Sequence, residues 1–286
     1  MTLTHLVDST RAELLRLRKW PAVWVTVGAW LALGLMFGYL LGYAAYATGD
    51  LNFASDGETR AELLAELLPS SIPAVLVQGM PMFGAALAMV LGAIVAGNGF
   101  GWGSWKTVFT QGPSRVSVVI GSMLALTAIV VAAVLTTLLL FTGLSVGIAA
   151  LESQPVVWPS AGRLVESVLG GVLVFEMWAL LGYALGTLAR GPALSVGLGL
   201  VWVLVVENLL RGVGALLGPV EQLTHALPGT AAGSLVGALL DVEANPNQTP
   251  GVLSVLPGDQ ALLVVVAYAV GVTLLVLAVV RRRDVA

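Results

Sequence analysis

Six long apolar stretches, separated by shorter polar segments, dominate the pattern of hydrophobic and polar positions along the chain. A helix needs about 20 apolar residues to cross roughly 30 Å of hydrocarbon. The stretches show no alternation of apolar and polar residues, and a backbone in lipid must satisfy its own hydrogen bonds, so they predict helices and exclude a β-barrel. We expect membrane spans near residues 22–46, 75–97, 116–146, 165–189, 193–217 and 260–280.

The third apolar run is longer than a bilayer requires, because it continues to Ala150 without a polar turn at its centre. We therefore predict one overlong helix, with Gly143 and Gly147 as the positions where it would bend. We find no convincing internal repeat, so a single membrane domain over residues 1–286 is the simplest organisation.

Residues 1–20 have a different pattern, in which apolar positions fall on one face of a helix and basic residues flank it until Pro21 interrupts the helix. We predict an amphipathic helix in the inner membrane interface. A solvated charged tail is the alternative. The apolar face comprises Leu3, Leu6, Val7, Thr10, Leu14 and Leu17.

Two outer segments carry shorter apolar patterns. Residues 58–68 place acidic and leucine side chains on opposite sides of a short helix. Residues 218–258 form an outer loop whose apolar stretch from Thr230 to Leu240 is too short to cross the membrane. This stretch could re-enter the outer leaflet, and its backbone must then be covered by protein.

The basic residues set the expected orientation, because short cytoplasmic loops are rich in lysine and arginine. Cytoplasmic N and C termini place ten basic residues inside and only three outside. The three outer residues are Arg60, Arg163 and Arg211. The ten inner residues are Arg11, Arg16, Arg18, Lys19, Lys106, Arg115, Arg190, Arg281, Arg282 and Arg283.

Composition narrows the functional classes. Hydrophobic residues make up 58% of the chain and charged residues 10%, so most of its surface must face lipid. The chain has no cysteine and only two histidines, which leaves no sign of a metal site. A net charge of −3 without a basic, aromatic-rich run argues against nucleic-acid binding.

The loop at residues 98–115 is the most informative polar segment. Tryptophans in this loop favour a membrane interface, but they could also fill a groove on a partner, and Ser104 is placed to cap a short helix. An ordinary aromatic belt with basic residues is the alternative. Lys106-Thr107 lacks the glycines of a phosphate-binding loop, so any ATPase must be a separate polypeptide.

Several loose motifs together resemble the permeases of the type-2 ATP-binding-cassette exporter family, over essentially the whole chain. They are the Gly-Trp-Gly-Ser turn at 101–104, the later Pro-Ser-Arg at 113–115, the Leu-Ala-Arg at 188–190, the Glu-Asn at 207–208 and the Arg-Arg-Arg-Asp at 281–284. The sequence departs from the family at Gly99, where members often carry an acidic residue.

The resemblance implies that residues 103–111 form a coupling helix against an ATPase subunit. It further implies ATP and magnesium on that subunit and none bound by this chain, a second identical or related permease as partner, and the plasma membrane of a prokaryote. The chain would then not be an enzyme by itself. The implied coupling residues are Trp102, Gly103, Ser104, Trp105, Lys106, Thr107, Gln111 and Arg115.

Two acidic residues lie inside predicted spans, where a charge is costly and usually faces protein or water. Glu176 and Glu207 could line a transport path or a subunit interface, or they could hold helices together. For Glu207 we favour a structural ion pair with Arg211, one turn later. No nucleophile or metal partner accompanies either carboxylate, so a hydrolytic centre is unsupported.

Glycines recur every fourth residue along the first predicted span, at Gly34, Gly38 and Gly42. Such a stripe lets another helix approach closely. It could mediate dimerisation or packing within one bundle.

The sequence thus predicts an all-α membrane protein, and its leading functional interpretation is the permease of an ATP-driven exporter. An ion-gradient-driven carrier that uses Glu176 is the main alternative. A membrane scaffold without transport activity is another. The substrate is not identified by the sequence.

Overall fold

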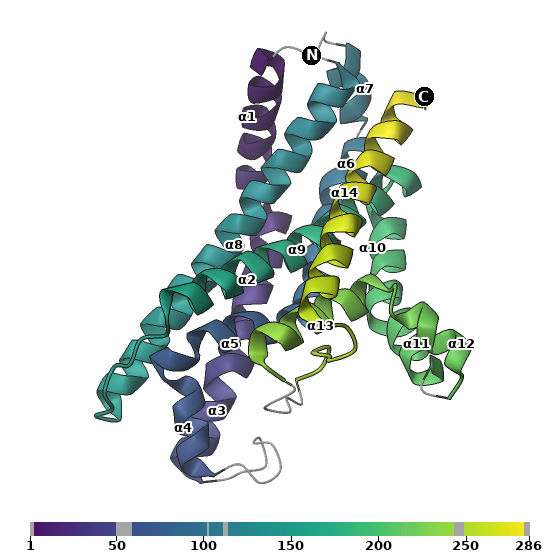
Figure 1. The fold of residues 1–286 in the computed structure, drawn as a ribbon. Coiled ribbons are helices and arrows are strands. Elements are labelled where there is room, and N and C mark those ends of the chain that lie inside the picture. Colours follow the sequence, from purple (N-terminus) through teal and green to yellow (C-terminus); the bar gives the residue numbers. More distant parts are fainter. Residues whose placement is uncertain are drawn as a thin grey trace.

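The structure is a computed structural model that describes residues 3–49, 59–101, 103–110, 114–214, 216–242 and 249–282. Over these ranges the chain is helical and contains no strand (Figure 1). Six helices are long and apolar enough to cross a membrane, which confirms the predicted number. They span Pro21–Thr48, Pro69–Gly101, Arg115–Leu151, Ala161–Ala189, Pro192–Gly214 and Gly258–Arg282.

Three spans consist of a single α-helix, and three contain a π-helical segment. The single helices are α8 (Arg115–Leu151), α9 (Ala161–Ala189) and α14 (Gly258–Arg282). The first span joins α2 (Pro21–Leu35), η1 (Met36–Leu40) and α3 (Leu41–Thr48). The second joins η3 (Pro69–Ser71), α5 (Ile72–Gln78), η4 (Met80–Gly84) and α6 (Ala85–Gly101), and the fifth joins α10 (Pro192–Val201), η5 (Trp202–Val206) and α11 (Glu207–Gly214).

The predicted overlong third span is α8, an uninterrupted helix of 37 residues that continues through Gly143 and Gly147. It begins after Ser114, whose hydroxyl accepts a hydrogen bond from the backbone N–H of Ser117, and this cap satisfies one of the free donors of the first turn.

The centre of the bundle is the contact between α6 and α9, where glycines let two backbones meet. A Cβ added to Gly92 would lie 1.8 Å from the carbonyl oxygen of Ala179, and one added to Gly182 would lie 2.0 Å from that of Met89. Without an aqueous solvent, close van der Waals contact of this kind is a main source of helix association. The α6–α9 pair is therefore the rigid core on which the other helices pack.

The glycine stripe of the first span packs within the same chain. A Cβ on Gly34 would lie 2.9 Å from Phe141 on α8, and a Cβ on Gly38 would lie 2.9 Å from Val75 on α5. Gly42 faces Leu67 of α4 (Arg60–Leu67). Of the two uses considered for this stripe, the structure shows packing inside one bundle.

The N-terminal helix α1 (Leu3–Lys19) packs along the first turns of α8 (Figure 1). Leu17 is fully buried, and a Cβ on Gly121 would lie 2.8 Å from the Cβ of Ser9. The side of α1 that faces the bundle also carries Glu13 and Arg16. The placement of α1 in a membrane interface stays a prediction.

Two short helices lie between the fifth and sixth spans, α12 (Gly218–Thr224) and α13 (Pro228–Leu240), and they meet at an angle of 71°. The residues of α13 from Pro228 to Gly237 are buried against the bundle. Protein therefore covers this apolar segment, as a re-entrant position would require.

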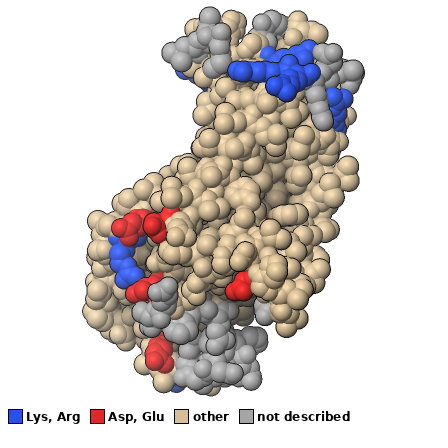
Figure 2. All heavy atoms as spheres, turned by 45° about the vertical axis from the view of Figure 1, so that its right-hand side comes forward, with Lys and Arg blue, Asp and Glu red and all other residues tan. Residues whose placement is uncertain are grey.

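Charge is segregated along the bundle. In the face shown in Figure 2, lysine and arginine gather mainly at one end and acidic residues lie toward the other. The described basic end includes α1, the first residue of α8 and the last turn of α14, and both chain ends lie there in Figure 1. This distribution agrees with the positive-inside rule if that end is cytoplasmic.

Candidate functional site

The predicted coupling helix is present as α7 (Ser104–Thr110), a short helix between the second and third spans at the end that carries both termini (Figure 1). Gly103 turns the chain into it with φ +67°, a conformation that favours glycine. Ser104 does not act as the predicted cap. It is the first helical residue, and its hydroxyl donates to the carbonyl of Gly99 at 3.2 Å.

Trp105 anchors α7 to its own chain. The side chain is 6% exposed, and its indole Nε1 donates to the carbonyl of Ala96 at 3.1 Å. It also stacks on Phe109, with ring centroids 5.4 Å apart. Trp105 therefore cannot fill a groove on a partner, which corrects one of the two uses considered for it.

The buried ring of Trp105 explains why position 99 is a glycine. A Cβ there would lie 2.0 Å from the indole Nε1 of Trp105. An acidic side chain at position 99 would occupy the space of the tryptophan ring. Trp105 thus leaves no room for a side chain at position 99.

The outer side of α7 is open. Thr107 and Thr110 are exposed, and the guanidinium of Arg115 lies 6.0 Å from the ring centre of Phe109. Trp102 and Gln111 lie outside the described residues, and only the backbone of Lys106 is described. The exposed threonines are thus the described positions at which a partner could contact α7.

A cavity of about 400 Å³ separates α7 from α1, and it contains an ion pair that the sequence interpretation did not single out. The guanidinium of Arg16 donates to Glu13 at 2.9 Å and to the carbonyl of Val95 at 3.2 Å. The hydroxyl of Ser122 donates to Glu13 at 3.0 Å. The spacing of Glu13 and Arg16 by three residues was the available sequence signal. These bonds tie α1 to α6 and α8.

Glu176 lies between α9 and α8, in the middle of the fourth span. Thr127 lies 2.7 Å from one carboxyl oxygen of Glu176 and 3.0 Å from the carbonyl of Met123. The other oxygen is buried and makes no hydrogen bond to a described residue. The hydroxyl of Thr127 on α8 therefore contacts the carboxyl group of Glu176 on α9 and joins the two helices at this level.

Glu207 has many more partners. Its carboxylate lies 3.6 Å from Arg211, as predicted, and accepts a hydrogen bond from the indole of Trp202 at 2.8 Å. It also accepts from the backbone N–H of Gly229, in the first turn of α13. A Cβ on Gly229 would lie 1.8 Å from the carboxylate. Glu207 therefore joins the fifth span to α13, which is a structural role.

A second polar cluster lies where the first and third spans end, at the end of the bundle opposite the two termini. Tyr46 and Tyr43 each donate a hydrogen bond of 2.8 Å to Glu152, just beyond the end of α8. These bonds, with Tyr46 first, hold the pKa of Glu152 below its ordinary value. Arg60 lies over the ring of Tyr46 at 5.0 Å and adds positive charge nearby.

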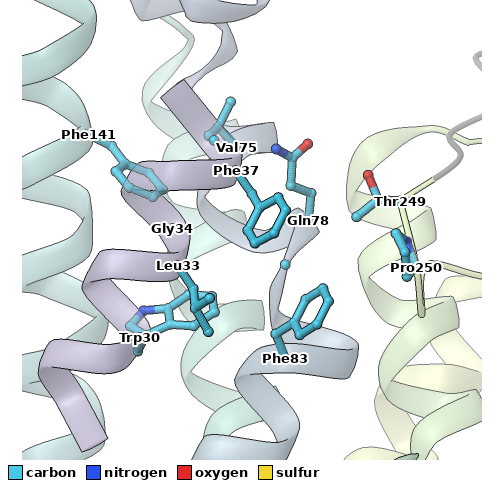
Figure 3. Close-up of a pocket in the computed structure, with 12 residues that line it drawn as sticks. Trp30, Leu33, Gly34, Phe37, Val75, Gln78, Phe83, Phe141, Thr249 and Pro250 are labelled. Atoms are coloured by element: carbon cyan, nitrogen blue, oxygen red, sulfur yellow. The ribbon is translucent and has the colours of Figure 1, made fainter. Parts of the chain in front are cut away.

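A pocket of about 210 Å³ opens at the level of the two π-helical segments η1 and η4 (Figure 3). The sequence interpretation missed it, although Gln78, a polar residue inside an expected span, was a usable signal. Its lining residues are Trp30, Leu33, Gly34, Phe37, Gly38, Val75, Gln78, Gly79, Phe83, Phe141, Thr249 and Pro250.

The arrangement defines a helical protein built for a membrane, with a short exposed helix at its basic end and a pocket between its spans. In comparisons with known proteins, no family model matched the chain and the search of curated proteins gave no match. Among the described residues, no group of three or more acidic or histidine side chains could hold a metal ion.

Proposed function

We propose that this chain is the membrane permease of an ATP-driven exporter of the type-2 ATP-binding-cassette kind, and that it works with separate ATPase subunits and a second identical or related permease. The observation that carries the proposal is α7, a short helix fixed on one side by Trp105 and exposed on the other. ATP and magnesium would bind to the ATPase. The expected location is the plasma membrane of a prokaryote.

The contacts of α7 could transmit a movement of the ATPase to the membrane-spanning helices. Trp105 ties α7 to the last turns of α6, and Arg115 on α8 lies against Phe109 of α7. Because α6 is locked to α9 by backbone contact, a displacement of α7 would move the α6–α9 pair as one body. Interfaces between such rigid bodies switch between discrete packing arrangements. A movement of α7 could therefore open a transport path between them.

The absence of cysteine from the sequence allows a direct test with single cysteine variants. Thr107→Cys on α7 should react with a membrane-impermeant maleimide only from the cytoplasmic side and should cross-link to a co-purified ATPase. Val157→Cys, exposed in the loop between α8 and α9, is the matched control and should react only from outside. Reaction of Thr107→Cys from outside would exclude this mechanism.

Co-purification from native membranes in mild detergent tests the partners. We expect a stoichiometric ATP-binding subunit, together with ATP hydrolysis in the eluate. If the chain elutes alone under conditions that preserve known membrane complexes, the exporter proposal fails.

An ion-gradient-driven carrier is the second candidate. The buried carboxyl oxygen of Glu176 that has no hydrogen-bond partner among the described residues favours it. In that case transport should need a proton gradient but no ATP, and Glu176→Gln should abolish it. Glu207→Gln is unsuitable as a control because Glu207 has a structural role.

A further inference from the structure

The pocket between η1 and η4 has walls that are fixed by contacts outside it. The indole Nε1 of Trp30 donates to Thr137 at 2.9 Å, and its ring meets Phe175 edge to face at 4.9 Å. Phe141 packs against Tyr39, with ring centroids 5.1 Å apart. Pockets that bind small molecules are typically formed in advance in this way.

Two of the spans that line the pocket carry a π-helical segment at that level. Phe37 and Gly38 belong to η1, and Phe83 belongs to η4. π-helical turns inside α-helices are rare and often mark functional sites. Two of the three such segments in the described part of the chain line this one pocket.

The lining favours one kind of chemistry. Four of the twelve lining residues that the structure describes are aromatic, and none of these twelve is charged. Phe37 and Phe83 are stacked at 5.9 Å with nearly parallel planes, and both are partly exposed at the bundle surface. A charged ligand would lose its hydration here without gaining a counter-ion, whereas an aromatic ring can add to the stack.

Gln78 supplies the polar contact. It is half-buried at the pocket, and its side chain forms no hydrogen bond with another residue that the structure describes. Figure 3 shows Gln78, Phe37 and Phe83 beside the same space, across from the Thr249–Pro250 segment. The amide can both donate to and accept from a ligand.

We infer that this pocket binds an uncharged aromatic molecule with one hydrogen-bonding group, which enters from the hydrocarbon between Phe37 and Phe83. The inference rests on the proposed transport function insofar as it names the class of substrate. Binding itself needs only this chain.

Benzophenone is a suitable probe, because it is neutral and aromatic, has one carbonyl acceptor, and forms covalent bonds with nearby C–H groups when irradiated. The full chain in lipid nanodiscs is irradiated with increasing benzophenone, and labelled residues are mapped by mass spectrometry. Saturable labelling is expected at Leu33, Phe37 and Phe83. Lipid-facing Leu263 and Leu274 on α14 should show only labelling that rises linearly with concentration.

Two variants test the contacts. Gln78→Leu keeps the side-chain volume but removes the amide. The benzophenone concentration at half-saturation should rise about fivefold, which is the effect of losing one neutral hydrogen bond. Gly79→Leu fills the pocket and should abolish the saturable component. Leu139→Ala, at an exposed position on α8, is the control that should leave labelling unchanged. Melting temperatures verify that each variant is folded.

Three results would overturn the inference: linear labelling of Phe37 and Phe83 in the wild-type chain, an unchanged half-saturation concentration in folded Gln78→Leu, or displacement of benzophenone by a phospholipid but not by an aromatic competitor. Competition separates an aromatic ligand from a lipid chain. Diphenylmethanol should displace benzophenone, and displacement by a short-chain phospholipid alone would assign the pocket to lipid. Saturable labelling without a co-purified ATPase would refute the exporter proposal but support the binding pocket. A co-purified ATPase with only linear labelling would support the exporter proposal but refute the binding pocket.

Discussion

Two sides of the bundle are held together by different means. On one side, α6 and α9 meet backbone to backbone through Gly92 and Gly182. On the other, the first span meets η4 and α8 through side chains, around a pocket. Backbone contact leaves no freedom to repack, whereas side chains can change rotamer. The comparison indicates that α6–α9 moves as a unit and that the pocket side tolerates small changes in side-chain volume more readily.

Gly182→Val should give the largest effect. Its Cβ would lie 2.0 Å from the carbonyl oxygen of Met89, so the helices must separate. We expect the free energy of unfolding to fall by about 3 kcal/mol, or the variant to fail to accumulate in the membrane. Thermal unfolding in detergent measures the change. Gly143→Val on α8, where nothing lies within 4 Å of an added Cβ, is the control, and an equal loss in both variants would contradict the contact.

Trp30→Phe should have an intermediate effect on the pocket side, because it removes the indole hydrogen bond to Thr137. A double-mutant cycle with Thr137→Val should give a coupling of about 1 kcal/mol, the typical value of one buried neutral hydrogen bond. If the two substitutions are additive in thermal unfolding, the bond does not fix the wall of the pocket.

Acidification should weaken the contacts of Tyr43 and Tyr46 with Glu152, which join the ends of the first and third spans. The pKa of Glu152 is lowered in the folded protein, so its stabilising effect is complete above the unfolded pKa and is lost as the pH falls through the folded value. The melting temperature of the wild type should therefore fall more than that of Glu152→Gln below about pH 4, near the ordinary glutamate pKa. Glu166→Gln, an exposed carboxylate on α9, should behave like the wild type.

Gly79→Ala should have the smallest effect. Its Cβ would lie 3.6 Å from the ring of Trp30, an ordinary contact, so the stability should stay within about 1 kcal/mol of the wild type. A loss as large as that of Gly182→Val would mean that the pocket side is as tightly packed as the α6–α9 contact, and the comparison would fail.

Hydrophobic periodicity and basic residues were enough to predict much of the fold. The six spans, the single long third helix and the short helix after Gly103 follow from local rules, because lipid permits only helices and glycine and proline interrupt them. The pairing of Glu207 with Arg211 followed from their spacing of four residues.

The direction in which side chains point could not be predicted in the same way. Tryptophan is amphipathic, so the sequence alone left open whether Trp105 lies in the membrane interface or fills a groove on a partner, and it did not indicate packing on its own bundle. The glycine stripe of the first span was likewise compatible with dimerisation or with packing inside one bundle, because a smooth helix face allows close approach of any other helix.

The sequence by itself determined that the chain is helical, how many spans it has and which end is basic, because these properties depend on residues close together in the chain. Only the tertiary structure decided that Trp105 anchors α7, that Gly34 and Gly38 pack inside the bundle, and that Gln78 meets Phe37 and Phe83 at one pocket. The contacts of Gly34 and Gly38, and the meeting of Gln78 with Phe37, join residues far apart in sequence. They depend on how the helices are rotated against one another, which no local pattern specifies.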